Sequence, residues 1–177
     1  ATSMNDIAKA TGMAKPGLYA NFGNKNRFYA EALKRYIEKN DTTSWGAFAE
    51  SQEPIDVAVS NLLQDTIAAS LDADLPCGCF LVNTLIETSD KPSEVAALGR
   101  ELSAERRGRL ADKFRQAATK GELSPHADPE RLADFVFGQI LALAAMSSEG
   151  VDTPKLVAFA EMGLKALPLA RTERAAL

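Results

Sequence analysis

Residues 3–25 read SMNDIAKATGMAKPGLYANFGNK, and this stretch predicts two short helices joined by a tight turn. The first helix is expected over residues 3–10, and Gly12 supplies the turn after it. The second is expected over residues 15–20, with Pro16 in its first turn, where a missing backbone N–H costs nothing. The pattern is a helix-turn-helix, which in DNA-binding proteins presents its second helix to the major groove.

Local details support this motif. Ser3 and Asp6 have the spacing of a capping box and predict the start of the first helix. Ala14 precedes the second helix and has no side chain that could cap it. We expect apolar side chains from both helices to hold the pair together, namely those of Ile7, Ala8, Met13, Leu18 and Phe22.

The charge distribution divides the chain in two. Residues 1–40 carry seven Lys or Arg and three acidic residues, a net charge of +4, whereas the whole chain has a net charge of -4. The remainder is therefore acidic. A basic head on an acidic body is expected where only the head meets phosphates. We accordingly predict a DNA-binding domain over residues 1–40 and a second domain over residues 41–177.

The motif resembles the DNA-binding domain of the tetracycline-repressor (TetR/AcrR) family. The marks of the resemblance are the Ile7-Ala8 pair, Gly12 in the turn, Gly17-Leu18-Tyr19 in the second helix, and Phe22-Gly23 followed by Lys25. The resemblance implies a transcriptional regulator that binds double-stranded operator DNA. Because members of the family have one more helix before this motif, it also implies that the given sequence lacks the first helix of the head.

The resemblance assigns DNA contacts residue by residue. Lys15 is expected at a phosphate or base edge, Gly17 leaves room for close approach, and Tyr19 donates its hydroxyl to a phosphate. Lys25 would hold phosphate at a helix N-terminus, where charge and free N–H groups act together. The full set of expected DNA-binding residues is Ser3, Lys15, Gly17, Tyr19, Asn21 and Lys25.

Beyond the motif the sequence predicts an all-α fold, because apolar residues recur at helical spacing between Gly and Pro breaks. A helix from Asn24 to about Lys39 is followed by a connection over residues 40–53. Further helices are expected from Pro54 to about residue 75 and over 78–88, 94–120, 129–148 and 154–167. By the resemblance, they form a helical ligand-binding and dimerisation domain.

The helix predicted over 129–148 is apolar on nearly all sides. Such a helix must be buried on more than one side. We therefore expect one side to meet the core and another to meet a second subunit, which predicts a homodimer through the last two helices. The residues assigned to this interface are Leu132, Val136, Ile140, Leu143, Leu156, Ala160, Gly163 and Leu164.

The resemblance further implies that a small molecule binds inside the helical domain and releases a repressor from its operator. The sequence does not identify this effector. Polar groups on apolar helices need partners, so Asn83, Glu87 and Gln139 are of special interest. The pocket residues expected are Phe80, Asn83, Thr84, Glu87, Phe114, Phe137 and Gln139, with Met146, Trp45 and Phe48 nearby.

Cys77 and Cys79 offer an alternative effector chemistry. A thiol at a helix N-terminus is activated, so the pair could sense oxidants, electrophiles or a soft metal. The other interpretation is that both are small structural residues. The charged run over residues 105–109 is interpreted as a solvated helix face, with an anion site or a partner contact as alternatives.

Other classes of function are disfavoured. One histidine and no metal-ligand, nucleophile or phosphate-loop pattern argue against an enzyme, a bound metal or a cofactor. A helical interaction module without DNA binding and a transcriptional activator remain as alternatives. No signal peptide and no apolar run of about 18 residues is found, so we expect a cytoplasmic protein without membrane contact.

Overall fold

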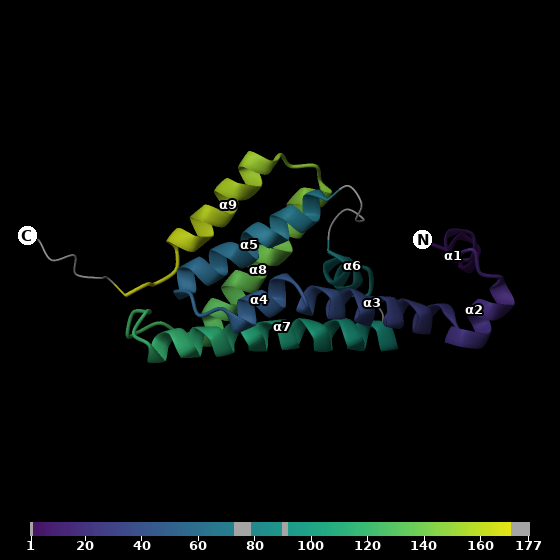
Figure 1. The fold of residues 1–177 in the computed structure, drawn as a ribbon, viewed down its shortest axis with the longest axis horizontal. Helices are drawn as coiled ribbons and strands as arrows, with labels where there is room; N and C mark the ends of the chain where they lie inside the picture. The colour runs from purple at the N-terminus through teal and green to yellow at the C-terminus, as the bar shows by residue number, and fades with distance from the viewer. Residues whose placement is uncertain (1, 73–78, 90–91, 171–177) are drawn as a thin grey trace, which may run out of the picture.

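The computed structural model describes residues 2–72, 79–89 and 92–170, and these form an all-α protein (Figure 1). No helix among these residues is long and apolar enough to cross a membrane. The helices of the described residues are α1 (Met4–Thr11), α2 (Lys15–Phe22), α3 (Lys25–Asp41), α4 (Ser44–Glu50), α5 (Ile55–Leu71), α6 (Phe80–Glu87), α7 (Glu94–Thr119), α8 (Pro129–Ser148) and α9 (Thr153–Lys165).

The helix boundaries follow the local chemistry of the chain. Ser3 and Asp6 form the predicted capping box at the start of α1, and Gly12 ends that helix with a positive φ of 68°. Asn24 caps α3 by accepting a hydrogen bond from Arg27 N at 2.9 Å. Asp128 and Asp152 cap α8 and α9 in the same way.

The molecule has a small head and a larger helical body. Helices α1 and α2 lie at the N-terminal end of α3, outside the body, and α3 runs from them along α7 into the body (Figure 1). The substantial contacts between helices link α1 to α2 and α2 to α3, so the head is connected to the body through α3. The orientation of this one helix therefore determines where the head lies.

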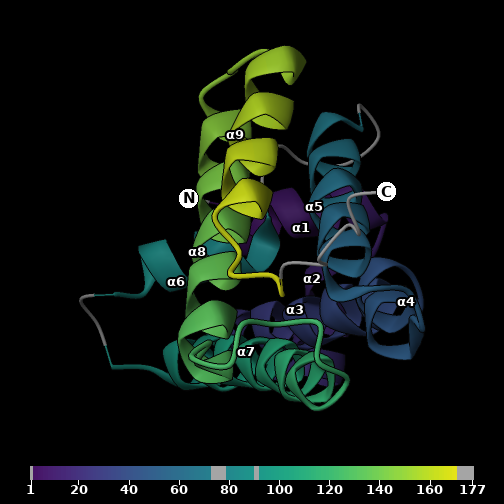
Figure 2. The same cartoon turned by 90° about the vertical axis from the view of Figure 1, so that its left-hand side faces the viewer.

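The main core lies among α4, α5, α7, α8 and α9, which pack around one another in the body (Figure 2). Its largest fully buried side chains include Phe114 and Phe137. A smaller cluster in the head contains Met4, Ile7 and Leu18. A third cluster joins α3 to α6 and α7, so that the helix bearing the head has its own apolar contact with the body.

The prediction of a connection over residues 40–53 is wrong in its middle. Ser44–Glu50 forms α4, and Trp45 and Phe48 are buried in the main core. Helix α4 begins so close to the end of α3 that a Cβ at Gly46 would lie 2.1 Å from Asp41 O. The glycine weakens the sequence signal for a helix, while the burial of the two aromatic side chains stabilises it.

The charged run over residues 105–109 is also not uniformly solvated. Arg106 is only 2% exposed, because its side chain lies against Asp41 of α3 and the Trp45 ring of α4. Lys113, two turns further along, is 8% exposed and donates to Ala49 O and Ser51 O at 3.1 and 2.6 Å. Helical periodicity places charges on a face, but only the packing decides which neighbour covers it.

Candidate nucleic-acid interface

The two helices of the head are held together by their apolar sides. Leu18 is fully buried between Met4 and Ile7, and Ala8, Phe22 and Phe28 pack around this cluster. The Phe22 and Phe28 rings meet edge to face, with centroids 4.9 Å apart, and so join α2 to α3. Met13 was expected in this cluster, but it is 37% exposed and lies outside it.

Four of the residues expected to contact DNA belong to α2, where Lys15, Tyr19 and Asn21 are exposed and Gly17 is half-buried. Lys15 is the first residue of the helix, and Tyr19 follows one turn later with 48% of its surface exposed. Asn21 donates from Nδ2 to Gly17 O at 2.9 Å, so its side chain lies along the helix backbone. Among the described residues, a Cβ at Gly17 would meet only Met13 Cε, at 4.0 Å, so these residues leave room there.

The remaining predicted contacts lie at helix starts. Ser3 accepts from Asp6 N at 3.3 Å while Asp6 Oδ2 accepts from Ser3 N at 2.8 Å. These bonds with Ser3 lower the pKa of Asp6, which stays ionised and completes the cap. Lys25 is the exposed first residue of α3, whose free N–H groups favour an anion.

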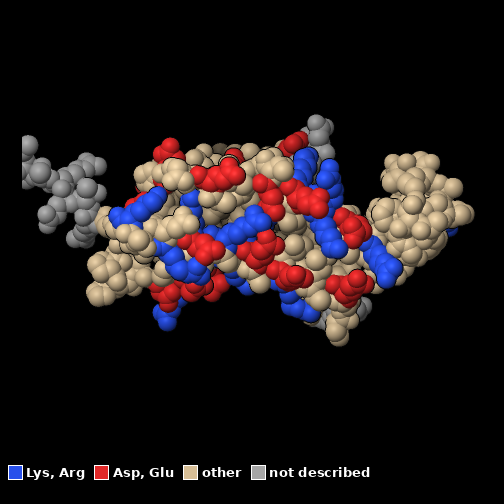
Figure 3. All heavy atoms as spheres, turned by 60° about the horizontal axis from the view of Figure 1, so that its bottom comes forward, with Lys and Arg blue, Asp and Glu red and all other residues tan. Residues whose placement is uncertain are grey.

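The head therefore combines an exposed recognition helix with a basic surface at two helix starts. Helix α2 carries no acidic residue, whereas acidic and basic side chains are interspersed over the body face that carries α7 (Figure 3). Such a head can bind phosphates and reach base edges in the major groove. The body face shown has no basic field that would compete for DNA.

Comparison with known families agrees with this geometry at both ends of the chain. Residues 1–32 match the family described as "Bacterial regulatory proteins, tetR family", and residues 58–162 match "Tetracyclin repressor-like, C-terminal domain". The chain belongs to the TetR family. It is a DNA-binding transcriptional regulator and not an enzyme. The family also removes the alternative of a helical module without DNA binding.

Individual relatives resemble this TetR-family regulator over nearly its whole length. The HTH-type transcriptional repressor ComR of Escherichia coli K12 is 27% identical over 168 residues, which cover 95% of this chain and 80% of ComR. A cysteine mutant of CifR, solved with a 26-base-pair operator, has a TM-score of 0.80 and 24% identity, covering 94% of this chain and 86% of that chain. AibR, solved with isovaleryl coenzyme A and operator DNA, has a TM-score of 0.69 and 19% identity, covering 94% and 87%.

The residues expected to line an effector pocket are divided between two places in the TetR fold. Phe80 and Thr84 lie on α6 against α3, with Asn83 half-buried beside them and Glu87 exposed at the helix end. Phe114, Phe137 and Gln139 lie in the body; both rings are 2% exposed or less within the main core. Gln139 is 5% exposed, and neither of its side-chain polar atoms has a hydrogen-bond partner among the residues that the structure describes.

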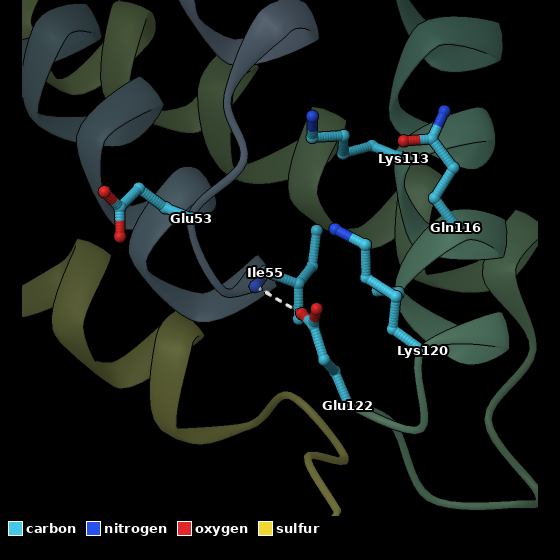
Figure 4. Close-up of a pocket in the computed structure, with 7 residues that line it drawn as sticks. Glu53, Ile55, Lys113, Gln116, Lys120 and Glu122 are labelled. Carbon is cyan, nitrogen blue, oxygen red and sulfur yellow. Dashed lines mark hydrogen bonds between the residues drawn. The ribbon is translucent and has the colours of Figure 1, made fainter.

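Two hollows found in the described part of the chain are lined by other residues. One, between α5 and α7, is lined by Ile55 and Lys113 among others and has a volume of about 10 Å³, which is room for one water molecule (Figure 4). In it Glu122 accepts a hydrogen bond from Ile55 N at 2.7 Å and so caps the start of α5. The other is an open hollow of about 420 Å³ along α3, beside Tyr36.

The structure describes one of the two cysteines, Cys79. Cys79 is half-buried at the start of α6, while Cys77 lies outside the described residues. Tyr36 Oη donates to Cys79 Sγ at 3.5 Å. Burial, with Cys79 as a second cause, raises the pKa of Tyr36 to about 12. The phenol therefore stays protonated beside the sulfur.

Proposed function

We propose that this chain is an operator-bound repressor that a small molecule releases. The observation that carries this proposal is the combination of an exposed recognition helix, α2, with a body that reaches it through α3. AibR, a structural neighbour, was solved with both an acyl coenzyme A and operator DNA. A ligand that binds one orientation of the heads better than another shifts the population toward that orientation.

The contact between α3 and α6 supports an effector site near Phe80. The Phe80 ring meets Tyr29 and Tyr36 of α3 with centroids 4.9 and 5.8 Å apart. Thr84 Oγ1 lies 2.9 Å from Tyr29 Oη and also donates to Phe80 O. A ligand that displaces α6 would therefore act directly on the helix that carries the head.

We also propose a homodimer through α8 and α9, but on a different face from the sequence prediction. Among the residues assigned earlier, Val136, Leu143 and Leu156 are at most 1% exposed within one chain, because they face the core of their own subunit. Other large apolar side chains of the same helices are exposed to solvent. Phe135, Val157 and Met162 are 42%, 38% and 71% exposed. These side chains are suited to an interface between copies.

The DNA-binding proposal is tested by anisotropy with the full-length protein and DNA from its own promoter region at several salt concentrations. We expect specific binding whose affinity falls steeply as salt rises, because phosphate contacts release counterions. Affinity that is indifferent to salt, or no preference for the promoter over unrelated DNA, would refute it.

A second candidate, a thiol-based sensor, is favoured by the hydrogen bond between Tyr36 and Cys79. This bond places the half-buried Cys79 sulfur at the contact between α3 and α6. Alkylation of Cys79 with a small electrophile would add a group where α3 and α6 meet, and operator affinity should fall. Unchanged affinity after complete modification, verified by intact mass, would exclude this candidate.

A further inference from the structure

Helix α3 ends in a charged cluster that was not expected from the sequence. Asp41, its last residue, accepts from Arg106 Nη1 at 2.5 Å and from both terminal nitrogens of Arg109, at 2.8 and 3.2 Å. The first two bonds share one carboxylate oxygen. Two cations of α7 are thereby bound to a single carboxylate of α3.

The surroundings of Arg106 give the cluster a defined geometry. Its guanidinium lies 4.4 Å from the centre of the Trp45 ring and also donates to Ile37 O at 3.4 Å. Burial lowers the pKa of Arg106, and the Asp41 carboxylate opposes that effect. Because Arg106 is 2% exposed, loss of Asp41 would leave a buried charge without a carboxylate partner.

The position of Asp41 points to a role beyond stability. A carboxylate at a helix C-terminus is opposed by the helix dipole, so the two arginines are what hold it there. The head lies at the other end of α3 (Figure 1). A helix of 17 residues is roughly 25 Å long, and a tilt of about 5° at one end moves the other end by about 2 Å.

We propose that Asp41, clamped by Arg106 and Arg109, is the positioning residue that sets the angle of α3 and thereby the spacing between the two heads of the dimer. This role of Asp41 rests on the proposed dimer, in which each head would bind one half of the operator, a half-site. The contacts of α3 with α6, at Thr84 and Cys79, are neutral hydrogen bonds and ring contacts, whereas the end of the helix is held by charge. Asp41 is thus the fixed end of α3, and α6 acts on its middle.

The test compares Asp41→Asn with the matched control Glu130→Gln. Glu130 also accepts from two nitrogens of one arginine, Arg115, but that pair joins α7 to α8 and does not reach α3. The probes are duplexes with two copies of the half-site that the wild-type protein selects from random-sequence DNA, at the selected spacing and one base pair longer or shorter. A duplex with one half-site reports on the head alone.

We expect Asp41→Asn to reduce the preference for the selected spacing by about tenfold, which corresponds to about 1.4 kcal/mol. Binding to the single half-site and the salt dependence should stay unchanged, and Glu130→Gln should behave like the wild type. A lower melting temperature with an unchanged spacing preference would show a merely structural ion pair and overturn the proposal. If Asp41→Asn lost as much affinity for the single half-site as for the paired half-sites, the proposal would be overturned as well.

A second variant and the wild-type measurement separate failure of the Asp41 proposal from failure of the proposed dimer. If Asp41→Asn does not fold, Arg109→Gln leaves the buried Arg106 pair intact and should give the same change to a smaller degree, because Arg109 is 31% exposed. Its failure to alter the spacing preference would then overturn the proposal. If the wild type itself shows no spacing preference, the proposed dimer fails, and the positioning role of Asp41 fails with it.

Discussion

Gly163 of α9 lies directly against the side chain of Gln139 of α8. A Cβ at Gly163 would lie 2.0 Å from Gln139 Oε1, so the close approach of the two helices depends on this glycine. In the described part of the chain, neither polar atom of the Gln139 side chain has a hydrogen-bond partner, although the residue is 95% buried. A buried carboxamide without partners destabilises the free protein unless a bound molecule completes its hydrogen bonds.

Gln139→Leu should therefore raise the free energy of unfolding by about 1–2 kcal/mol, because it removes unsatisfied polar atoms at nearly constant volume. Chemical denaturation measures this change. Gln116→Leu is the control: Gln116 is exposed on α7, and its replacement should stay within about 0.5 kcal/mol of the wild type. A destabilised Gln139→Leu would mean that the carboxamide has partners after all. If the effector binds Gln139, the effector should also no longer release the Gln139→Leu variant from its operator.

Gly17→Ala should separate stability from DNA binding. A Cβ there has no neighbour closer than 4.0 Å among the described residues, and alanine favours a helix by about 0.5–1 kcal/mol over glycine. We expect a more stable protein that binds its promoter DNA less tightly, since the methyl group enters the space left for DNA. Gly108→Ala on α7 has equally open surroundings and should stabilise without affecting binding. Unchanged promoter affinity in Gly17→Ala would argue against close approach of DNA at this position.

Tyr19→Phe and Lys25→Ala should weaken binding to all DNA sequences alike, because phosphate contacts carry no sequence information. Lys25→Ala removes a charge and should lower the slope of log affinity against log salt by about 1, whereas Tyr19→Phe should leave that slope unchanged. Lys155→Ala removes an exposed charge from α9 and serves as the control. A variant that loses affinity for one sequence only would instead identify a base contact.

Tyr36 should make the protein less stable at high pH. Its pKa is raised to about 12 from 10.0, so between these values the unfolded chain has lost the phenol proton while the folded chain retains it. The contribution to stability is complete below pH 10 and is lost as the pH rises through 12, by roughly 3 kcal/mol at most.

Tyr36→Phe should flatten this part of the pH profile of unfolding. In a spectrophotometric titration of the folded protein, it should also remove the tyrosine that ionises last. Tyr19→Phe is the control, because Tyr19 is 48% exposed on the head. An unchanged high-pH step in Tyr36→Phe would assign that step to another tyrosine.

Phe135→Glu should convert the proposed dimer into a monomer, since it places a charge at the outer face of α8. Light scattering measures the mass directly. Ile86→Glu provides a control, because Ile86 is 64% exposed and belongs to α6 rather than to either helix of the proposed interface. A Phe135→Glu protein that stays dimeric would place the interface elsewhere.

The sequence by itself determined the features that depend on local chemistry. The Ser3–Asp6 cap, the Gly12 turn and the spacing of Leu18 and Phe22 define the helix-turn-helix, because capping, turn conformation and short-range apolar contact act within about 20 residues. The starts and ends of α7, α8 and α9 were predicted for the same reason, within a few residues.

Only the tertiary structure decided what covers each helical face. The sequence predicts that α8 is apolar on several sides, but not that Val136 and Leu143 face their own core while Phe135 faces outward. It shows Arg106 in a charged run, but not that Asp41 and Trp45 enclose it. Helical periodicity repeats every 3.6 residues whatever the neighbour is. The packing of the helices therefore decides which side of a helix meets α3, which meets the core and which meets a partner.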